Sequence, residues 1–470
     1  MIDLDLCYTP ATLLAQRIRD KQISPVALVQ NSLERIEAVN PTLNCFCFVY
    51  PDEALSAAKA AEGAVMRGET LGPLHGVPIA IKDFTPTAGK TTTLGSRIYA
   101  DWVPDEDAQI VKDLRAAGAI MVGKTTTPEF AHAGFTHSPL WGVTRNPWDP
   151  ERTPGGSSGG SGAAVASGCV PLAEGSDMGG SVRIPAAHCG LVGLKPSLGR
   201  IPMTVLPTVF DNISHFGPLA RSIDDTALFL SVTQGPYERD IMSCPTPAEL
   251  EIPNAGDVTG MRIALDMDLG FFHIDDEIAG NVEACAAALR DAGAIVEEVD
   301  VGWSAECADV WNDYWCVYLA AFFEQHLDER RAELDPTIVE FFEHARTIDA
   351  ISLKRMEHVR TQQWLALCEV FDRYDALICP TQQILPPPAH HTDGMYEGTN
   401  ESGKRTGTVT TSIFNNIAQC PVLSVPAGWS HSGLPTAVQI AGHRFDDPTV
   451  LRIGAAIERQ RAWADRRPAI

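Results

Sequence analysis

A strand-like segment, a helix-like segment and a second strand-like segment follow one another in two parts of the chain. In the first part, LHGVPIAIKDF (74–84) alternates apolar with smaller residues and predicts a buried strand ending near Lys82 and Asp83. A helix over 108–117 and a strand over 120–122 come next. The second part repeats this order at 261–265, 276–292 and 295–299. Such alternation predicts an α/β fold with a mixed, mainly parallel central sheet covered by helices on both faces.

The length and composition of the chain favour a single large domain. Its 470 residues are 45% hydrophobic, enough to bury a large core, and no composition shift or charge run marks a boundary. We therefore predict one domain over 1–470. Within it we expect an N-terminal helical part over 1–70, a core over 71–230 and an aromatic-rich helical insertion over 303–375 that roofs a ligand pocket.

Charge and apolar patterning argue against several classes of partner. The chain has 36 Lys and Arg against 60 Asp and Glu, and the net charge of −24 disfavours nucleic acid and anionic membranes. No apolar run approaches the roughly eighteen residues of a membrane span, and the acidic N-terminus lacks the pattern of a signal peptide. The twelve cysteines form no C-x-x-C pair, which is typical of reduced core residues. We expect a cytoplasmic protein.

Residues 155–161 are all glycine or serine, which is typical either of a flexible linker or of a binding loop. The chain continues into AAVASGCVPLAEG, which predicts a tightly packed helix and strand, and then into a second small-residue cluster, GSDMGGSVRIPAA (175–187). We interpret the two clusters as loops that lie side by side, where glycines let backbone N–H groups surround a ligand or a reacting oxygen. Neither cluster carries the lysine of a P-loop, and the turn-like RNPWDPERTP before the first argues against a dinucleotide site. Residues 155–159 match the G-x-S-x-G nucleophile elbow, with Ser157 as its serine, but no strand precedes them.

Lys82 has two interpretations. A lysine at a strand end usually lies in solvent, here beside Asp83. In a desolvated pocket, however, a lysine loses its proton more easily and can act as a base. Together with two serine-bearing loops, such a lysine would supply a nucleophile and a base without histidine.

Several ordered segments together resemble the amidase signature family. They are LHGVPIAIKDF, TPGGSSGGSGAAVASGCVPLAEGSDMGGSVRIPAAHCGLVGLKPSLGR, FGPLARSIDD, CPVLSVPAG and GLPTAVQIAG. The resemblance implies a Ser–cis-Ser–Lys triad with Ser181 as nucleophile, Ser157 as bridging serine after a non-proline cis peptide bond, and Lys82 as base. It implies an oxyanion hole formed by the backbone N–H groups of Met178, Gly179 and Gly180. It also implies supporting roles for Ser158, Ser176 and Asp177.

The same resemblance implies no metal and no organic cofactor. A proline-rich loop does bring together His390, His391 and Asp393, but without further nearby ligands these residues predict no metal site. A homodimer is the expectation at the level of the family.

The resemblance predicts an amidohydrolase that cleaves a carboxamide C–N bond through an acyl-enzyme on Ser181, with Ser157 and neutral Lys82 as proton relay. Where many members have small residues, this chain has EFAHAGFTHSPLWG, with His132, Phe135, His137 and Trp141. These bulkier side chains favour an aryl or hydrophobic amide.

Three other functions remain open. One is an aryl acylamidase or urethanase acting on carbamates and esters. Another is the A-type component of a glutamyl-tRNA amidotransferase, which needs partner subunits. The third is a non-catalytic binding module, against which the intact Lys82, Ser157 and Ser181 argue.

Overall fold

The computed structural model, which describes residues 2–470, alternates helices and strands along most of the chain. The helices are α1 (Leu4–Tyr8), α2 (Ala11–Arg19), α3 (Pro25–Leu43), α4 (Pro51–Arg67), α5 (Gln109–Ala116), α6 (Gly159–Ala166), α7 (Arg183–Cys189), α8 (Ile223–Thr233), α9 (Asp276–Asp291), α10 (Glu306–Phe323), α11 (Leu327–Arg330), α12 (Pro336–Ala345), α13 (Ala350–Phe371) and α14 (Asp447–Gln460). The strands are β1 (Phe46–Val49), β2 (Pro78–Lys82), β3 (Ile120–Thr125), β4 (His137–Ser138), β5 (Gly142–Val143), β6 (Leu172–Asp177), β7 (Val192–Lys195), β8 (His215–Ala220), β9 (Arg262–Leu265), β10 (Ile295–Glu298), β11 (Ala376–Pro380), β12 (Gly398–Thr399), β13 (Arg405–Thr406), β14 (Val422–Trp429) and β15 (Pro435–Gly442).

One mixed sheet organises the domain, with the strand order β1-β3-β2-β6-β8-β7-β14-β15-β11-β9-β10. The two predicted helix-linked units form parallel pairs, β2 with β3 across α5 and β9 with β10 across α9. Parallel pairing also joins β2 to β6 and β11 to β9. The strands between these two groups pair antiparallel. The predicted α/β fold with a mixed sheet is confirmed, and its parallel character is concentrated on the two flanks.

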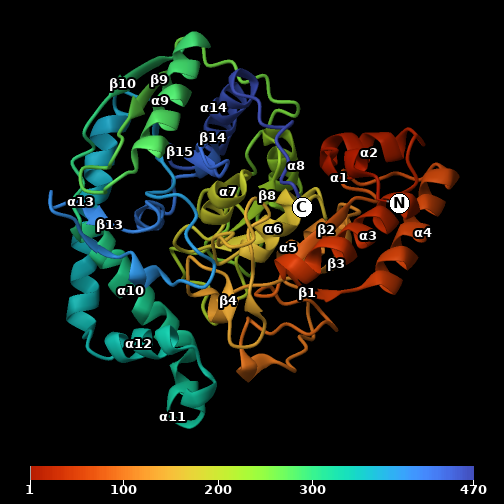
Figure 1. Cartoon of the computed structure of the whole chain (residues 1–470), viewed down its shortest axis with the longest axis horizontal. Coiled ribbons are helices and arrows are strands. Elements are labelled where there is room, and N and C mark those ends of the chain that lie inside the picture. The colour runs from red at the N-terminus through yellow and green to blue at the C-terminus, as the bar shows by residue number, and fades with distance from the viewer. Residues whose placement is uncertain (1) are drawn as a thin grey trace.

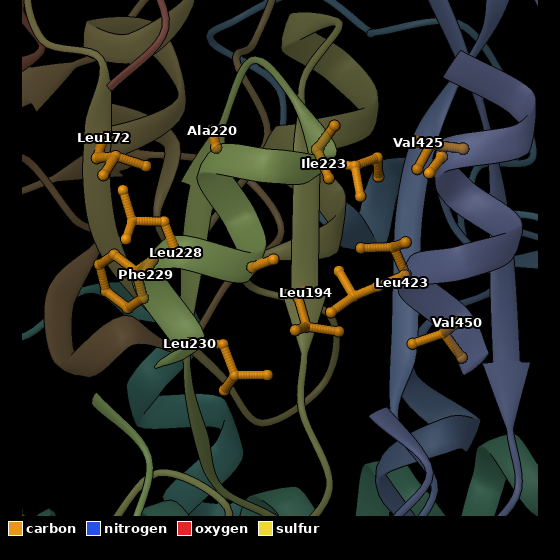
Figure 2. Close-up of a cluster of buried hydrophobic side chains, with 14 of the residues drawn as sticks. Leu172, Leu194, Ala220, Ile223, Leu228, Phe229, Leu230, Leu423, Val425 and Val450 are labelled. Atoms are coloured by element: carbon orange, nitrogen blue, oxygen red, sulfur yellow. The ribbon is translucent and has the colours of Figure 1, made fainter. Parts of the chain in front are cut away.

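Helices cover both faces because neighbouring side chains on a strand point to opposite sides. In β2, Ile79 and Ile81 join a core that includes residues of α2, α5, α8, α9 and α14. Ala80 joins a second core with residues of α3, α4 and α6. Figure 2 shows part of the first core, where Leu194 of β7 and Phe229 of α8 lie between the strands and the helices. The same alternation directs Lys82 toward the face that α6 covers.

Helices α1–α4 and helices α10–α13 lie at opposite ends of the molecule, whereas the last helix, α14, packs between them against α8 and α9 (Figure 1). At one end are α1–α4. Helix α3 is capped by Ser24, which accepts from the N–H groups of Val26 and Ala27, and Pro25 is its first residue. At the other end are α10–α13, within the predicted helical stretch. Among residues 2–470, no helix combines the length and apolar character needed to cross a membrane.

The glycine and serine run is buried from residue 155 to residue 161 and forms the start of α6 and the loop before it. It is therefore not a linker between domains. Small residues are needed there because backbone segments pass close by. A Cβ added at Gly160 would lie 2.5 Å from the backbone nitrogen of Thr126 and 2.6 Å from its carbonyl oxygen.

We expect Gly160→Ala to lower the free energy of unfolding by about 1–3 kcal/mol, because backbone atoms cannot rotate away from the added methyl group. Urea denaturation measures this change. Gly280→Ala in α9 is the matched control, since nothing lies within 4 Å of its added Cβ. It should be neutral or raise stability by up to about 1 kcal/mol. Equal stability of Gly160→Ala and the unmodified protein would contradict the close packing.

Candidate active site

Lys82, the last residue of β2, is fully buried and lies among three serine hydroxyls. Its Nζ lies 2.7 Å from Ser157 Oγ, 2.9 Å from Ser158 Oγ and 3.0 Å from Ser176 Oγ. Burial lowers the pKa of Lys82 to about 7, although the charges of Glu174 and Asp177 act in the opposite direction. Lys82 is therefore not a solvated strand end, and near neutral pH a large fraction of it is uncharged.

Glu174 holds the end of β2 in place from the neighbouring strand β6. Its carboxylate accepts from the backbone N–H of Lys82 at 2.9 Å and from the hydroxyl of Thr85 at 3.0 Å, and the residue is fully buried. Burial raises the pKa of Glu174, although these hydrogen bonds and the charge of Lys82 oppose the change. Glu174 is not among the site residues predicted from the sequence, where its signal is a single carboxylate inside the apolar segment PLAEG.

The two small-residue loops meet at Ser157 and Ser158. The peptide bond between Gly156 and Ser157 is cis. The N–H of Ser158 donates to the carbonyl oxygen of Ser181 at 3.2 Å, and the hydroxyl of Ser158 donates to the carbonyl oxygen of Ser176 at 3.3 Å. These bonds confirm that the loops lie side by side.

Ser181 lies in the turn between β6 and α7 and lines a pocket. Among the described residues, no hydrogen bond joins its hydroxyl to that of Ser157, so their direct contact stays a prediction.

An ion pair behind this turn fixes its shape. Asp177 accepts from the backbone N–H groups of Gly180 and Val182 and from Nε and Nη2 of Arg183, at 2.9–3.3 Å. Burial would raise the pKa of Asp177, but the charge and hydrogen bonds of Arg183 outweigh it and hold the pKa well below its usual range. Arg183 also donates to the side chain of Asn415 at 2.8 Å.

We expect Arg183→Met to lower the free energy of unfolding by about 3–5 kcal/mol, because it leaves the buried carboxylate of Asp177 without its cationic partner. Thermal and urea denaturation measure the loss. The double variant Asp177→Asn/Arg183→Met should recover part of it, since the uncompensated charge is then absent. If the double variant is less stable than Arg183→Met, the uncompensated charge of Asp177 is not the cause of the loss.

The three backbone amides predicted as an oxyanion hole lie in the same turn. That of Gly180 donates to Asp177 Oδ1 at 2.9 Å and is already engaged. The N–H groups of Met178 and Gly179 have no acceptor among the residues that the structure describes. Their carbonyl groups are fixed, since that of Met178 accepts from Trp311 Nε1 at 3.1 Å and that of Gly179 accepts from Thr411 Oγ1 at 2.8 Å.

A pocket of about 130 Å³ opens beside Ser181. Its larger apolar side chains are those of Ile184, Phe272, Trp311, Trp315 and Phe341. Its larger polar side chains are those of His132, Asn312, Gln383, Asp393, Glu397 and Arg405. Helices α10 and α12 thus contribute aromatic residues to one wall, and the loop that contains Asp393 contributes charged residues to another.

Only one of the four bulky residues expected near the pocket lies there. His132 lines it, but Phe135, His137 and Trp141 do not. Phe135 is buried and stacks on Tyr396 with the ring centroids 6.3 Å apart. Trp141 packs against the ring of Phe48, and its Nε1 donates to the hydroxyl of Thr93 at 2.9 Å. Phe135, His137 and Trp141 therefore do not shape this pocket, and the inference of an aryl substrate from these three residues is wrong.

In the proline-rich loop, His391 and Asp393 form hydrogen bonds within the protein. His391 Nδ1 lies 2.6 Å from the hydroxyl of Tyr396, and Asp393 accepts from the N–H of Gly134 at 2.8 Å. Across the part of the chain that the structure describes, no three His, Cys, Asp or Glu side chains are grouped so as to hold a metal ion.

Comparisons with known proteins agree with this fold. A family model described as Amidase matches residues 27–451. The chain is 35% identical to an acylamidase of Rhodococcus erythropolis, over 100% of this chain and 99% of that protein. It is also 35% identical to the A-type component of the glutamyl-tRNA(Gln) amidotransferase of Chloroflexus aurantiacus, over 95% and 96% of the two chains. The solved structure of a bacterial aryl acylamidase superimposes with a TM-score of 0.91 at 31% identity, covering 97% of each chain.

The fold and these relatives define an enzyme that hydrolyses C–N bonds. The chain belongs to the amidase signature family.

Proposed function

We propose that this amidohydrolase forms an acyl-enzyme on Ser181, with Ser157 and uncharged Lys82 as its proton relay. The observation that carries this proposal is the burial of Lys82 with its Nζ 2.7 Å from Ser157 Oγ. A carboxamide is a poor electrophile, so the attacking hydroxyl must lose its proton as it attacks. Lys82 takes a proton from Ser157 while Ser157 takes one from Ser181.

The tetrahedral intermediate then places a negative charge on the former carbonyl oxygen. The N–H groups of Met178 and Gly179 stabilise this oxyanion, because they lie in the turn that leads to Ser181. The peptide group with the N–H of Gly179 is held by Trp311, which donates to the carbonyl oxygen of Met178. The peptide group with the N–H of Met178 is held by Asn415, which donates to the carbonyl oxygen of Asp177. The relay run in reverse protonates the departing amine, and water attacks the acyl-enzyme by the same route. Ser158 and Ser176 orient the amino group of Lys82.

The substrate class that we propose is an aryl or hydrophobic amide, with α10–α13 as the roof of the pocket. Aromatic walls from Phe272, Trp311, Trp315 and Phe341 support it. The volume of about 130 Å³ is close to the roughly 150 Å³ of a cavity that accepts benzene. The aryl acylamidase structure supports the same class.

A matched panel tests the proposed function. The purified chain is assayed with a small aliphatic amide, an aryl anilide and an aryl carbamate. We expect the anilide to have the highest kcat/KM. A clear preference for the carbamate would favour the urethanase alternative, and a preference for the small amide would overturn the aryl class.

The amidotransferase alternative is favoured by one observation, the 35% identity to a component of a glutamyl-tRNA(Gln) amidotransferase. It predicts that the purified chain releases ammonia from glutamine only when partner subunits are added. Turnover of any anilide by the chain alone argues against it.

A further inference from the structure

Two carboxylates, those of Asp393 and Glu397, line the pocket beside Ser181. Asp393 lines the pocket, and one of its oxygens accepts from the backbone N–H of Gly134 at 2.8 Å. Glu397 lines the same wall nearer the solvent. Among the described residues, no arginine or lysine forms an ion pair with either carboxylate. Burial raises the pKa of Asp393 to about 6, so above that pH its carboxylate is charged and available to a ligand.

Two uncharged side chains in the pocket add further acceptors. Gln383 is 2% exposed, and its Nε2 donates to the carbonyl oxygen of Val409 at 2.8 Å. Its Oε1 is buried with no hydrogen-bond partner in the part of the chain that the structure describes. His132 Nδ1 lies 2.8 Å from the carbonyl oxygen of Glu129 and must carry the proton, because a carbonyl only accepts. Burial lowers the pKa of His132, which leaves Nε2 as an acceptor.

The strong donors of the pocket are already engaged within the protein. Trp311 Nε1 donates to Met178, and Trp315 Nε1 donates to the carbonyl oxygen of His132 at 3.2 Å. The guanidinium of Arg405 forms an ion pair with Asp309 of α10. Apart from the backbone N–H groups of Met178 and Gly179 beside Ser181 and the remaining N–H groups of Arg405, side-chain donors of the pocket such as the amide of Asn312 can also accept. A ligand that fits this arrangement is rich in donors and positively charged.

We propose that the pocket binds the protonated amine of an amide substrate, and that Asp393 is the residue that determines this specificity. The inference rests on the proposed hydrolysis at Ser181 and names its substrate class as amides that carry an ammonium group. The aromatic side chains of Trp311 and Trp315 line the same pocket, and a cation over an indole ring is attracted to it. The net charge of −24 raises the local concentration of such substrates.

The first test compares pairs of p-nitroanilides of equal length. One member carries a terminal ammonium group on an acyl chain of two to five carbons, and the other carries a methyl group in its place. We expect at least one ammonium member to have the higher kcat/KM. Equal or lower values for every ammonium member would overturn the inference while leaving amide hydrolysis intact.

The second test is Asp393→Asn, which keeps an oxygen for the N–H of Gly134. It should lower kcat/KM for the preferred ammonium substrate by about 10- to 100-fold, as expected for the loss of a charge-assisted hydrogen bond. Turnover of the methyl partner should stay nearly unchanged, which also reports that the variant is folded. Glu401→Gln, an exposed carboxylate of the same loop that does not line the pocket, is the matched control and should change neither value. An equal loss on both substrates in Asp393→Asn would contradict the assigned role.

The third test does not depend on turnover. Benzylammonium and benzyl alcohol are titrated calorimetrically into Ser181→Ala, and into Ser181→Ala/Asp393→Asn. We expect benzylammonium to bind more tightly, by about 10-fold or more, and Asp393→Asn to remove the difference. If no anilide is hydrolysed but this difference is present, the proposed function fails and the cation site stands. If the two probes bind equally, the cation site fails.

Discussion

Ser181→Ala is expected to reduce kcat on every amide that the enzyme hydrolyses by about 10⁴- to 10⁶-fold, because it removes the hydroxyl that we propose as the nucleophile. Steady-state assays with an anilide measure the loss. A covalent adduct on the Ser181 peptide, trapped from an aryl carbamate and detected by mass spectrometry, should disappear in the variant.

Ser412→Ala is the matched control for this substitution. Ser412 lines the same pocket, but we assign its hydroxyl no part in the relay, so its loss should change kcat far less. Turnover that persists in Ser181→Ala would contradict the assignment of Ser181 as the nucleophile. Ser157, in the nucleophile-elbow motif, would then be the next candidate.

Lys82→Ala is expected to lower kcat/KM by about 10²- to 10⁴-fold, the usual contribution of a general base. The pH profile is the sharper readout. The base must be uncharged to accept a proton, so activity of the unmodified enzyme should rise as the pH increases through about 7, where Lys82 loses its proton, and level off above it. Lys82→Ala should lose this inflection, and an added small primary amine should restore part of the activity.

Lys195 provides the control, because it is also buried and burial also lowers its pKa to about 7. Its Nζ instead donates to carbonyl oxygens, the nearest that of Cys420 at 2.7 Å. Lys195→Met should therefore keep the inflection near pH 7, even if its stability changes. An inflection retained in Lys82→Ala and lost in Lys195→Met would mean that the wrong lysine has been assigned.

Local patterns were sufficient for much of the fold. The alternation within residues 74–84 predicts β2, and the helix predicted over 108–117 is found as α5 (Gln109–Ala116). Ser24 predicts the start of α3 because capping depends only on nearby residues. The antiparallel centre of the sheet could not be predicted in this way, because pairing such as that of β8 with β6 depends on contacts between distant segments.

In the candidate site, too, residues in local motifs can be predicted from the sequence, whereas residues brought together by distant contacts cannot. Lys82, Ser157 and Ser181 are identifiable because they lie in dense local motifs that resemble a family. The walls of the pocket are not identifiable so reliably. Trp141 and Trp311 are the same residue type, so the sequence does not distinguish their roles. Trp141 contacts Phe48 and Trp311 lines the pocket because of how whole helices and strands pack. Asp393 stands out in the sequence only as a neighbour of two histidines, a pattern that suggests a metal rather than an ammonium group.

The groups assigned to the chemistry come from residues 82–183, whereas most of the pocket wall comes from residues 272–412. Mutation can therefore alter what the enzyme accepts while leaving the relay untouched, which allows a lineage to acquire new substrates in small steps. The two regions touch where Trp311 and Thr411 bond to the turn before Ser181. We expect these two positions to diverge more slowly than the rest of the wall, since a change there disturbs both regions at once.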